Sequence, residues 1–240
     1  MEKVMEERDK GQPANEHIFE IRYKPNPKIL DYRGTWAELI SKHMGLPDWR
    51  ILENRVDVFD KETKNRCFVG FRNSGCTTRD APTANYFPDQ AVKFFRYVLS
   101  LDGFGKAPFV ERIGVRIRFL TPHTSTFDDL LNRYANRYLK MTEAAEKAIR
   151  AKLIDIGGPL NFVDKHGNFN TSSGPMIDEQ SSELFPWKEN LPKVGLYYDI
   201  DYWQKPMQEV SDVEILKIIS TFAKEAWERH ERVKQLIMGE

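Results

Sequence analysis

Two short stretches decide the fold: Phe19-Glu20-Ile21-Arg22-Tyr23 (FEIRY) near the start of the chain, and Val115-Arg116-Ile117-Arg118-Phe119 (VRIRF) near its middle. In both stretches apolar and charged residues alternate, which is the pattern of a β-strand with one buried and one solvent-facing side. The similarity of the two stretches raises the question of whether one structural unit occurs twice in the chain. The segments that follow each stretch favour a repeat.

The first of these segments has the pattern of a helix start. GTWAELI (34–40) matches STFDDLL (125–131), with Thr35 and Thr126 as expected caps and Glu38 and Asp129 three residues later, where an acid favours the positive end of a helix. A second pair, FDKETKNRCFVGFRNSG (59–75) and VDKHGNFNTSSG (163–174), has the pattern of β-hairpins. Each copy then closes with an apolar-striped helix, the last beginning at Ser211.

These matches predict an α+β fold of duplicated β-α-β-β-α units, residues 17–103 and 110–240, after a leader of residues 1–16. The units would form a largely antiparallel sheet with helices on one face, in a TBP-like or ferredoxin-like arrangement. The second unit would have an added helix (142–152), an added strand (193–203) and a long C-terminal helix (212–238) whose far end leaves the domain. The alternative is one ferredoxin-like unit that ends at Phe119, with a separate tail.

Composition restricts the function classes. Hydrophobic residues make up 40% and charged residues 30% of the 240 residues, as in soluble globular proteins, and 36 basic residues balance 36 acidic ones. No overall field therefore attracts nucleic acid or an anionic membrane. Only Cys67 and Cys76 are present, without a CxxC pair, which favours reduced thiols in a cytoplasmic protein and no structural zinc. We expect no cofactor, no signal peptide and no membrane span.

The charged side of the expected strands is the first candidate site. Arg22, Arg116 and Arg118 lie on it, and the added strand contributes further polar and aromatic residues. One interpretation is a solvated ladder of ion pairs; the other is a groove that binds nucleic acid or a nucleotide, because arginines beside aromatics can hold phosphates and stack bases. The candidate binding residues are Arg22, Arg116, Arg118, Tyr197, Asp199, Asp201, Tyr202 and Trp203.

No complete catalytic group is recognisable. His123-Thr124-Ser125 has the H-x-S pattern of two-histidine phosphoesterases, but the first copy has no matching histidine. Asp199 and Asp201 share one side of a strand without an indicated third metal ligand, and Cys76 has no histidine near it in sequence. A hydrolase of unknown type is therefore the weakest of three hypotheses, and no residue is assigned a catalytic role.

The leading hypothesis is a non-enzymatic module for protein binding or assembly, through a protein partner or self-association. Residues 171–192 have the pattern of a long loop, and such loops are usually functional. Phe185 and Trp187 on this loop and Trp227 on the last helix are the candidate interface anchors, because exposed aromatics are typical of interfaces.

FEIRY (19–23), WRILENRVDVFD (49–60) and FVERIGVRIRFL (109–120) together resemble a sporadically distributed prokaryotic family of uncharacterised proteins. The resemblance implies no reaction and no cofactor. The patchy distribution of that family suggests mobile loci, so the resemblance implies a place in a phage-defence or toxin–antitoxin system.

Overall fold

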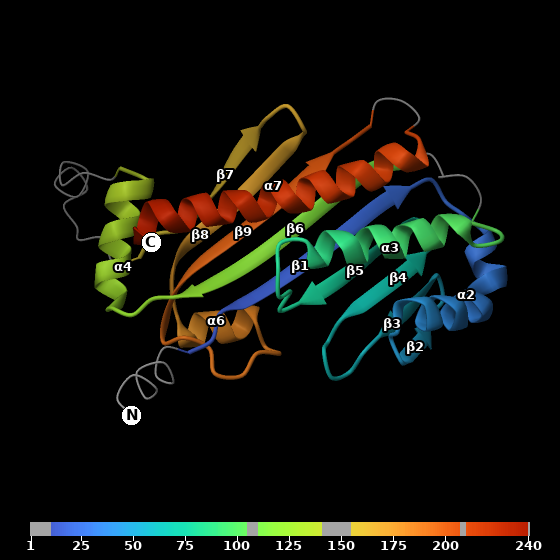
Figure 1. Ribbon diagram of the computed structural model, residues 1–240, viewed down its shortest axis with the longest axis horizontal. Coiled ribbons are helices and arrows are strands. Elements are labelled where there is room, and N and C mark those ends of the chain that lie inside the picture. The colour runs from blue at the N-terminus through green and yellow to red at the C-terminus, as the bar shows by residue number, and fades with distance from the viewer. Residues whose placement is uncertain (1–10, 105–109, 141–154, 207–209, 240) are drawn as a thin grey trace.

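One antiparallel sheet runs through the protein, whose computed structural model describes residues 11–104, 110–140, 155–206 and 210–239. The α+β class is confirmed, and the strand order across the nine-stranded sheet is β2-β3-β4-β5-β1-β6-β9-β8-β7 (Figure 1). The strands are β1 (Ala14–Tyr23), β2 (Asp48–Ile51), β3 (Arg55–Phe59), β4 (Arg66–Gly70), β5 (Asn73–Arg79), β6 (Val110–Pro122), β7 (Gly158–Val163), β8 (Asn168–Ile177) and β9 (Val194–Gln204).

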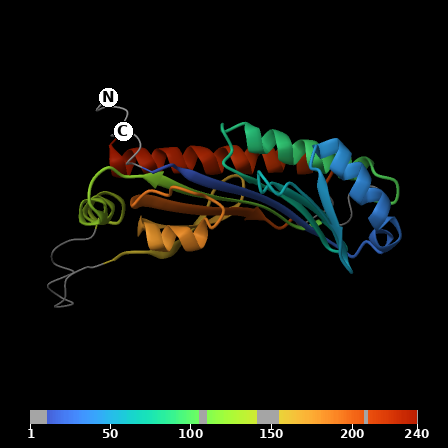
Figure 2. The ribbon, with the colours of Figure 1, turned by 90° about the horizontal axis from the view of Figure 1, so that it is seen from below.

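The helices lie on both faces of this sheet, although unequally. Those on the main helical face are α2 (Lys28–Met44), α3 (Tyr86–Ser100), α4 (Phe127–Arg133), which continues as a π-helical turn (Tyr134–Tyr138), and the long C-terminal α7 (Asp212–Met238). The short α6 (Asp178–Leu184) lies on the other face (Figure 2). Among the described helices, the expectation that every helix covers one face is therefore wrong for α6, and the other face stays largely open.

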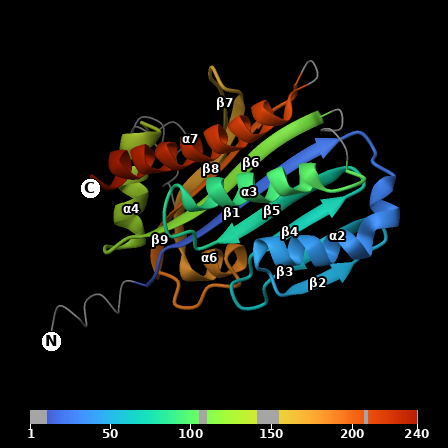
Figure 3. The same cartoon turned by 45° about the vertical axis from the view of Figure 1, so that its right-hand side comes forward.

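The stretches FEIRY (19–23) and VRIRF (115–119) form the middle of the sheet. FEIRY belongs to β1 and VRIRF to β6, and these strands pair with Phe19 directly opposite Val115. Figure 3 shows both strands crossing beneath α3 and α7. Since β7, β8 and β9 continue the same sheet, the alternative of a separate tail after Phe119 is wrong. A common origin of the two halves stays a prediction.

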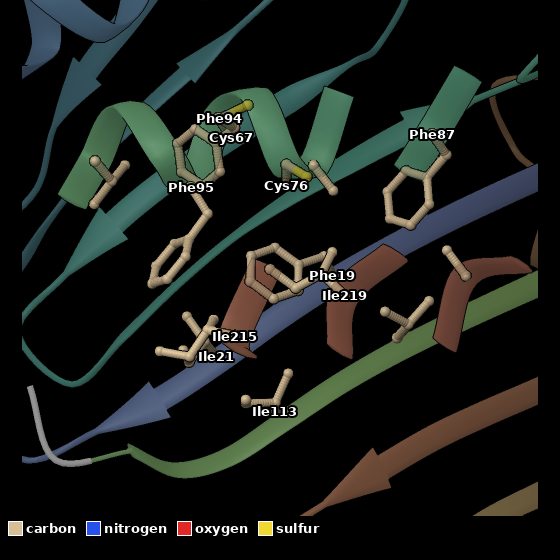
Figure 4. Close-up of a cluster of buried hydrophobic side chains, with 14 of the residues drawn as sticks. Phe19, Ile21, Cys67, Cys76, Phe87, Phe94, Phe95, Ile113, Ile215 and Ile219 are labelled. Atoms are coloured by element: carbon tan, nitrogen blue, oxygen red, sulfur yellow. The ribbon is translucent and has the colours of Figure 1, made fainter. Parts of the chain in front are cut away.

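The core fills the space between the sheet and the long helices. Phe19 and Ile21 of β1 are fully buried, beside Ile113 of β6. They lie together with apolar side chains of α3 and α7, among them Phe95 and Ile219 (Figure 4). Burying each of these side chains contributes about 1.5–3 kcal/mol, so the alternation in FEIRY is enough to fix which side of β1 faces the helices.

Two of the expected helix starts are confirmed and one is wrong. Thr126 accepts a hydrogen bond from the Asp129 N–H at the start of α4, and Ser211 and Glu214 form the capping box of α7. Thr35, in contrast, lies inside α2, which begins at Lys28. The Thr-aromatic match between the halves therefore does not mark equivalent helix starts.

The far end of α7 does not leave the domain. Ile237 and Met238 are buried against α4 and the π-helical turn, and Arg133 and Arg137 donate hydrogen bonds to the last carbonyl groups at 3.2 and 3.0 Å. Cations at this position satisfy otherwise unpaired carbonyls and favour the negative end of the helix. The predicted length of this helix, 212–238, is confirmed.

Other boundaries differ in informative ways. Ala14–Glu16, assigned to the leader, begin β1, and residues 171–192 contain the end of β8 and all of α6 instead of one long loop. The added strand is β9, while the added helix (142–152) lies outside the described residues. Cys76, expected in a loop, lies on β5 directly opposite Cys67, and both thiols are free and buried.

Candidate functional site

The open face of the sheet is the side opposite α2, α3 and α7. Strand alternation and register place charged side chains of β1 to β6 and of β9 on it. Its strand arginines are Arg22, Arg50, Arg55, Arg66, Arg79, Arg112, Arg116 and Arg118, and its strand carboxylates are Glu16, Glu20, Asp48, Asp57, Asp199 and Asp201. The strands thus contribute two more arginines than carboxylates to this face, while α6 adds the exposed acids Asp178, Glu179 and Glu183.

Glu16 of β1 is the most enclosed carboxylate at the centre of this surface. Its side chain is 3% exposed and lies between Arg79 of β5 and Arg118 of β6, which are its direct cross-strand neighbours. Arg79 Nε donates to Glu16 Oε1 at 3.0 Å, and Arg118 Nη2 donates to Glu16 Oε2. Each charge-assisted bond replaces water that the carboxylate loses on burial. Three strands are thereby joined through one side chain.

Asp199 of β9 forms a second such centre. Arg116 binds it with both arms of the guanidinium, Nε to Oδ1 at 3.0 Å and Nη2 to Oδ2 at 2.5 Å, and the Tyr197 hydroxyl donates to Oδ2 at 3.1 Å. The bond to Asp199 raises the pKa of Arg116, while burial raises the pKa of Tyr197. The next carboxylate, Asp201, accepts from Arg112 at 3.0 Å.

The arginines of this face also cover aromatic rings. Arg79 lies over Trp187 at 3.9 Å, Arg112 over Trp203 at 5.7 Å and Arg118 over Phe185 at 5.8 Å, measured from the guanidinium carbon to the ring centroid. A cation over a ring gains about 0.5–1 kcal/mol at exposed sites. The guanidinium groups are therefore ordered from two sides, by a carboxylate and by a ring, before any ligand is present.

The sequence-predicted binding residues divide between the two faces. Seven of the eight lie on the open face, where Arg22 is 53% exposed and bonded to Glu20 at 2.5 Å. The prediction that Tyr202 belongs to this binding surface is corrected. Its side chain is fully buried on the helical side, where the hydroxyl donates a hydrogen bond to Asp164. Its position on β9 is one residue out of phase with Asp201 and Trp203, so the pleat points it to the core.

The prediction that Phe185, Trp187 and Trp227 form an interface is also corrected. Phe185 is fully buried beside Tyr197, and Trp187 lies half-buried beneath Arg79, so neither is a free anchor. Trp227 lies on the helical side of the sheet, stacked on His17 with ring centroids 5.5 Å apart. The three aromatics therefore do not form one surface.

Sequence reasoning missed the contribution of β2 and β5 to this face. Asp57 of β3, fully buried between Arg50 and Arg55, and the Arg79–Glu16 pair were not expected. The sequence of β5, NSGCTTR (73–79), does not predict a strand, because its residues are small or polar on both sides. Trp49 of edge strand β2, 51% exposed, was also missed, because only its place at the sheet edge makes it accessible.

The side chains of the described residues are suited to binding a ligand more than to catalysing a reaction. Within the described residues, no cluster of three or more His, Cys, Asp or Glu could hold a metal ion. His123 Nε2 lies 3.0 Å from Asp129 Oδ2, but Arg133 binds the same carboxylate at 3.0 Å at the start of α4. The bond from His123, followed by the charge of Arg133, lowers the pKa of Asp129, so this pair stabilises the helix start.

Comparison with known proteins adds no family. No protein-family model matches the chain. No curated protein matches it in sequence. In the part of the chain that the structure describes, no helix combines the length and the apolar composition that crossing a bilayer requires.

Proposed function

We propose that the protein is a non-enzymatic binding module whose open sheet face recognises a protein partner with an acidic surface. The observation that carries the proposal is the ordering of the arginines, since seven of the eight are held by a carboxylate and several also by an aromatic ring. Arginine and aromatic residues are enriched at protein interfaces and dominate their hot spots. Side chains that are already ordered lose little entropy when a partner covers them.

The same ion pairs favour a protein over nucleic acid as the partner. A phosphate that approached Arg116 or Arg118 would compete with Asp199 or Glu16, whose side chains are only 9% and 3% exposed. Pulling Arg116 away would leave the buried Asp199 without its arginine, which costs several kcal/mol, of order 3–5, and pulling Arg118 away would leave Glu16 with Arg79 alone. A protein partner can instead pack over the intact pairs and contribute carboxylates at the exposed rim.

Nucleic-acid binding is the second candidate, and two observations favour it. The strands place eight arginines against six carboxylates on this face, by the residues named above. Arg22 and Arg116 are also 53% and 48% exposed, so part of each guanidinium is free to contact a phosphate.

Fluorescence anisotropy with labelled single-stranded and double-stranded oligonucleotides separates these functions. We expect only weak binding, with a Kd above about 1 μM at about 150 mM salt, which is typical of non-specific contacts. A submicromolar Kd that weakens more than about tenfold between about 50 and 200 mM salt would contradict the protein-binding proposal. Arg22→Glu, a change at an exposed position, should then abolish that affinity, whereas Lys224→Glu on the helical side serves as the control.

A place in a prokaryotic defence or toxin–antitoxin system rests on the sequence resemblance alone and forms part of the same proposal. In such a system the acidic partner would be encoded beside this protein. Co-expression with each neighbouring gene, followed by purification at low and high salt, tests this step, because an electrostatic interface weakens as salt rises.

A further inference from the structure

A pocket of about 440 Å³ lies on the open face, where β1, β4 and β5 meet the β3–β4 turn, and it shares Glu16 and Arg79 with the surface described above. Five cationic side chains line it: Arg50, Lys61, Lys64, Arg66 and Arg79. Its two carboxylates are Glu16 and Asp60. Its volume falls in the range of pockets that hold small ligands, about 300–1,000 Å³.

The carboxylates of this pocket are occupied by the protein itself. Glu16 is bound by Arg79 and Arg118. Asp60 accepts hydrogen bonds at 2.8 Å from the Glu62 N–H and from the Thr63 hydroxyl within its own turn. The backbone bond from Glu62, followed by the bond from Thr63, lowers the pKa of Asp60, so Asp60 is ionised at neutral pH.

The cations of the pocket are not all engaged. Arg50 binds Asp57 and Lys61 binds Asp48, each at 2.8 Å. Lys64 and Arg66 are exposed, and within the described part of the chain neither side chain makes a hydrogen bond or an ion pair. Lys64 and Arg66 add positive charge at the rim of the cavity, although the charge of Lys64 also acts on Asp60, and two positive charges match the charge of −1.5 to −2, roughly, of a phosphate monoester.

The backbone holds these cations in place. Lys64 has φ of 60°, in the left-handed region that residues other than glycine rarely adopt. The bonds to Asp60 and the Asp60 N–H to Asn65 carbonyl bond at 3.0 Å close this turn at both ends. A fixed turn keeps the backbone of Lys64 and Arg66 at the pocket without a ligand, so the ordering that binding requires is limited to their side chains.

Apolar and hydroxyl groups complete the pocket. Ile18 and Phe59 are partly buried among its lining, and Thr77 is 8% exposed. This surface lies beside the cations and can contact a planar ring, while the hydroxyl offers one further polar contact. We infer that the pocket binds a phosphorylated organic molecule of about nucleotide size, with its phosphate at Lys64 and Arg66 and its ring against Phe59 and Ile18.

Isothermal titration calorimetry with AMP, adenosine, ribose 5-phosphate and inorganic phosphate tests this inference. The expected result is that AMP binds with a Kd below about 1 mM and that the three partial probes bind at least about tenfold more weakly. Adenosine that matches AMP would overturn the role of the cations. Inorganic phosphate or ribose 5-phosphate that matches AMP would overturn the role of the ring surface, and no binding of AMP would overturn the whole inference.

Variants locate the site. Arg66→Gln and Lys64→Asn each remove one unpaired cation, and asparagine tolerates the left-handed backbone at position 64. Each change should weaken AMP binding by about tenfold or more, because a charge-assisted contact to phosphate is lost. Lys224→Gln on α7 is the matched control and should leave the Kd unchanged. Equal affinity in all three variants would place any AMP site elsewhere and contradict the inference, which does not depend on the protein partner.

Discussion

Glu16→Gln is expected to lower the free energy of unfolding by about 3 kcal/mol, and up to about 5 kcal/mol. The change removes the only charge that lies between Arg79 and Arg118, whose side chains are 26% and 18% exposed. Two like charges then face each other across β1 with one neutral amide between them. Urea unfolding followed by circular dichroism measures the loss.

Glu20→Gln is the matched control for this change. Glu20 lies on the same side of the same strand, but its side chain is 28% exposed and its partner Arg22 is 53% exposed. Exposed pairs of this kind contribute about 0–1 kcal/mol. If the two variants lost the same stability, the buried centre at Glu16 would not hold β1, β5 and β6 together. The double variant with Arg118→Gln should recover part of the loss, because one of the repelling charges is gone.

Acid is expected to destabilise the protein through two buried histidines, His17 and His230, which are 1% and 4% exposed. Burial, followed by the charge of His230, lowers the pKa of His17 from 6.5 to about 3, and burial is also the main cause that lowers the pKa of His230. The native state therefore keeps His17 neutral while the unfolded chain binds a proton below pH 6.5. Stability is full above that pH and falls as the pH drops toward 3.

The expected loss from His17 is about 1.4 kcal/mol per pH unit, or about 2 kcal/mol between pH 6.5 and about pH 5. His17 packs on Phe87 of α3, Phe119 of β6 and Trp227 of α7, and its Nε2 donates to Asn15 at 2.9 Å. Proton uptake there loosens the seam between the two long helices.

Chemical denaturation at several pH values between about 7.5 and 5 measures this slope. His17→Gln should reduce the slope of unfolding free energy against pH by the contribution of about one proton, because glutamine does not titrate. His43, whose pKa is also lowered by burial and by Lys93, contributes equally to both proteins and so does not change the difference. An unaltered slope in His17→Gln would show that His17 is not held neutral.

The parts of the fold that the sequence predicts are those with a strict period. Alternation in β1, β6 and β9 fixes which side chains form the open face, since a shift by one residue would bury arginines. The capping residues at 126 and 211 fix the starts of α4 and α7 because their side chains bond to the first free N–H groups. Seven of the eight candidate binding residues follow from that alternation alone.

The parts that sequence reasoning could not reach depend on contacts between distant segments. β5 lacks an apolar period, and it pairs between β4 and β1 through its backbone. Phe185 was expected to be exposed because its segment is polar, but α6 folds back and buries it against Tyr197 and Leu120. Glu16 binds Arg79 and Arg118, which lie 63 and 102 positions away from it in the chain. Only the strand order brings these two arginines to Glu16.

Site-specific photo-cross-linking in the native host measures most directly whether the open face binds a protein. A photoreactive residue at Asn170, exposed on the open face beside Asp201, is compared with one at Val213, 76% exposed on α7. We expect an adduct from position 170 that protease removes and nuclease does not, that Arg22→Glu abolishes, and that position 213 does not give. A nuclease-sensitive adduct at position 170, or an adduct from position 213 alone, would contradict the proposed role of this face.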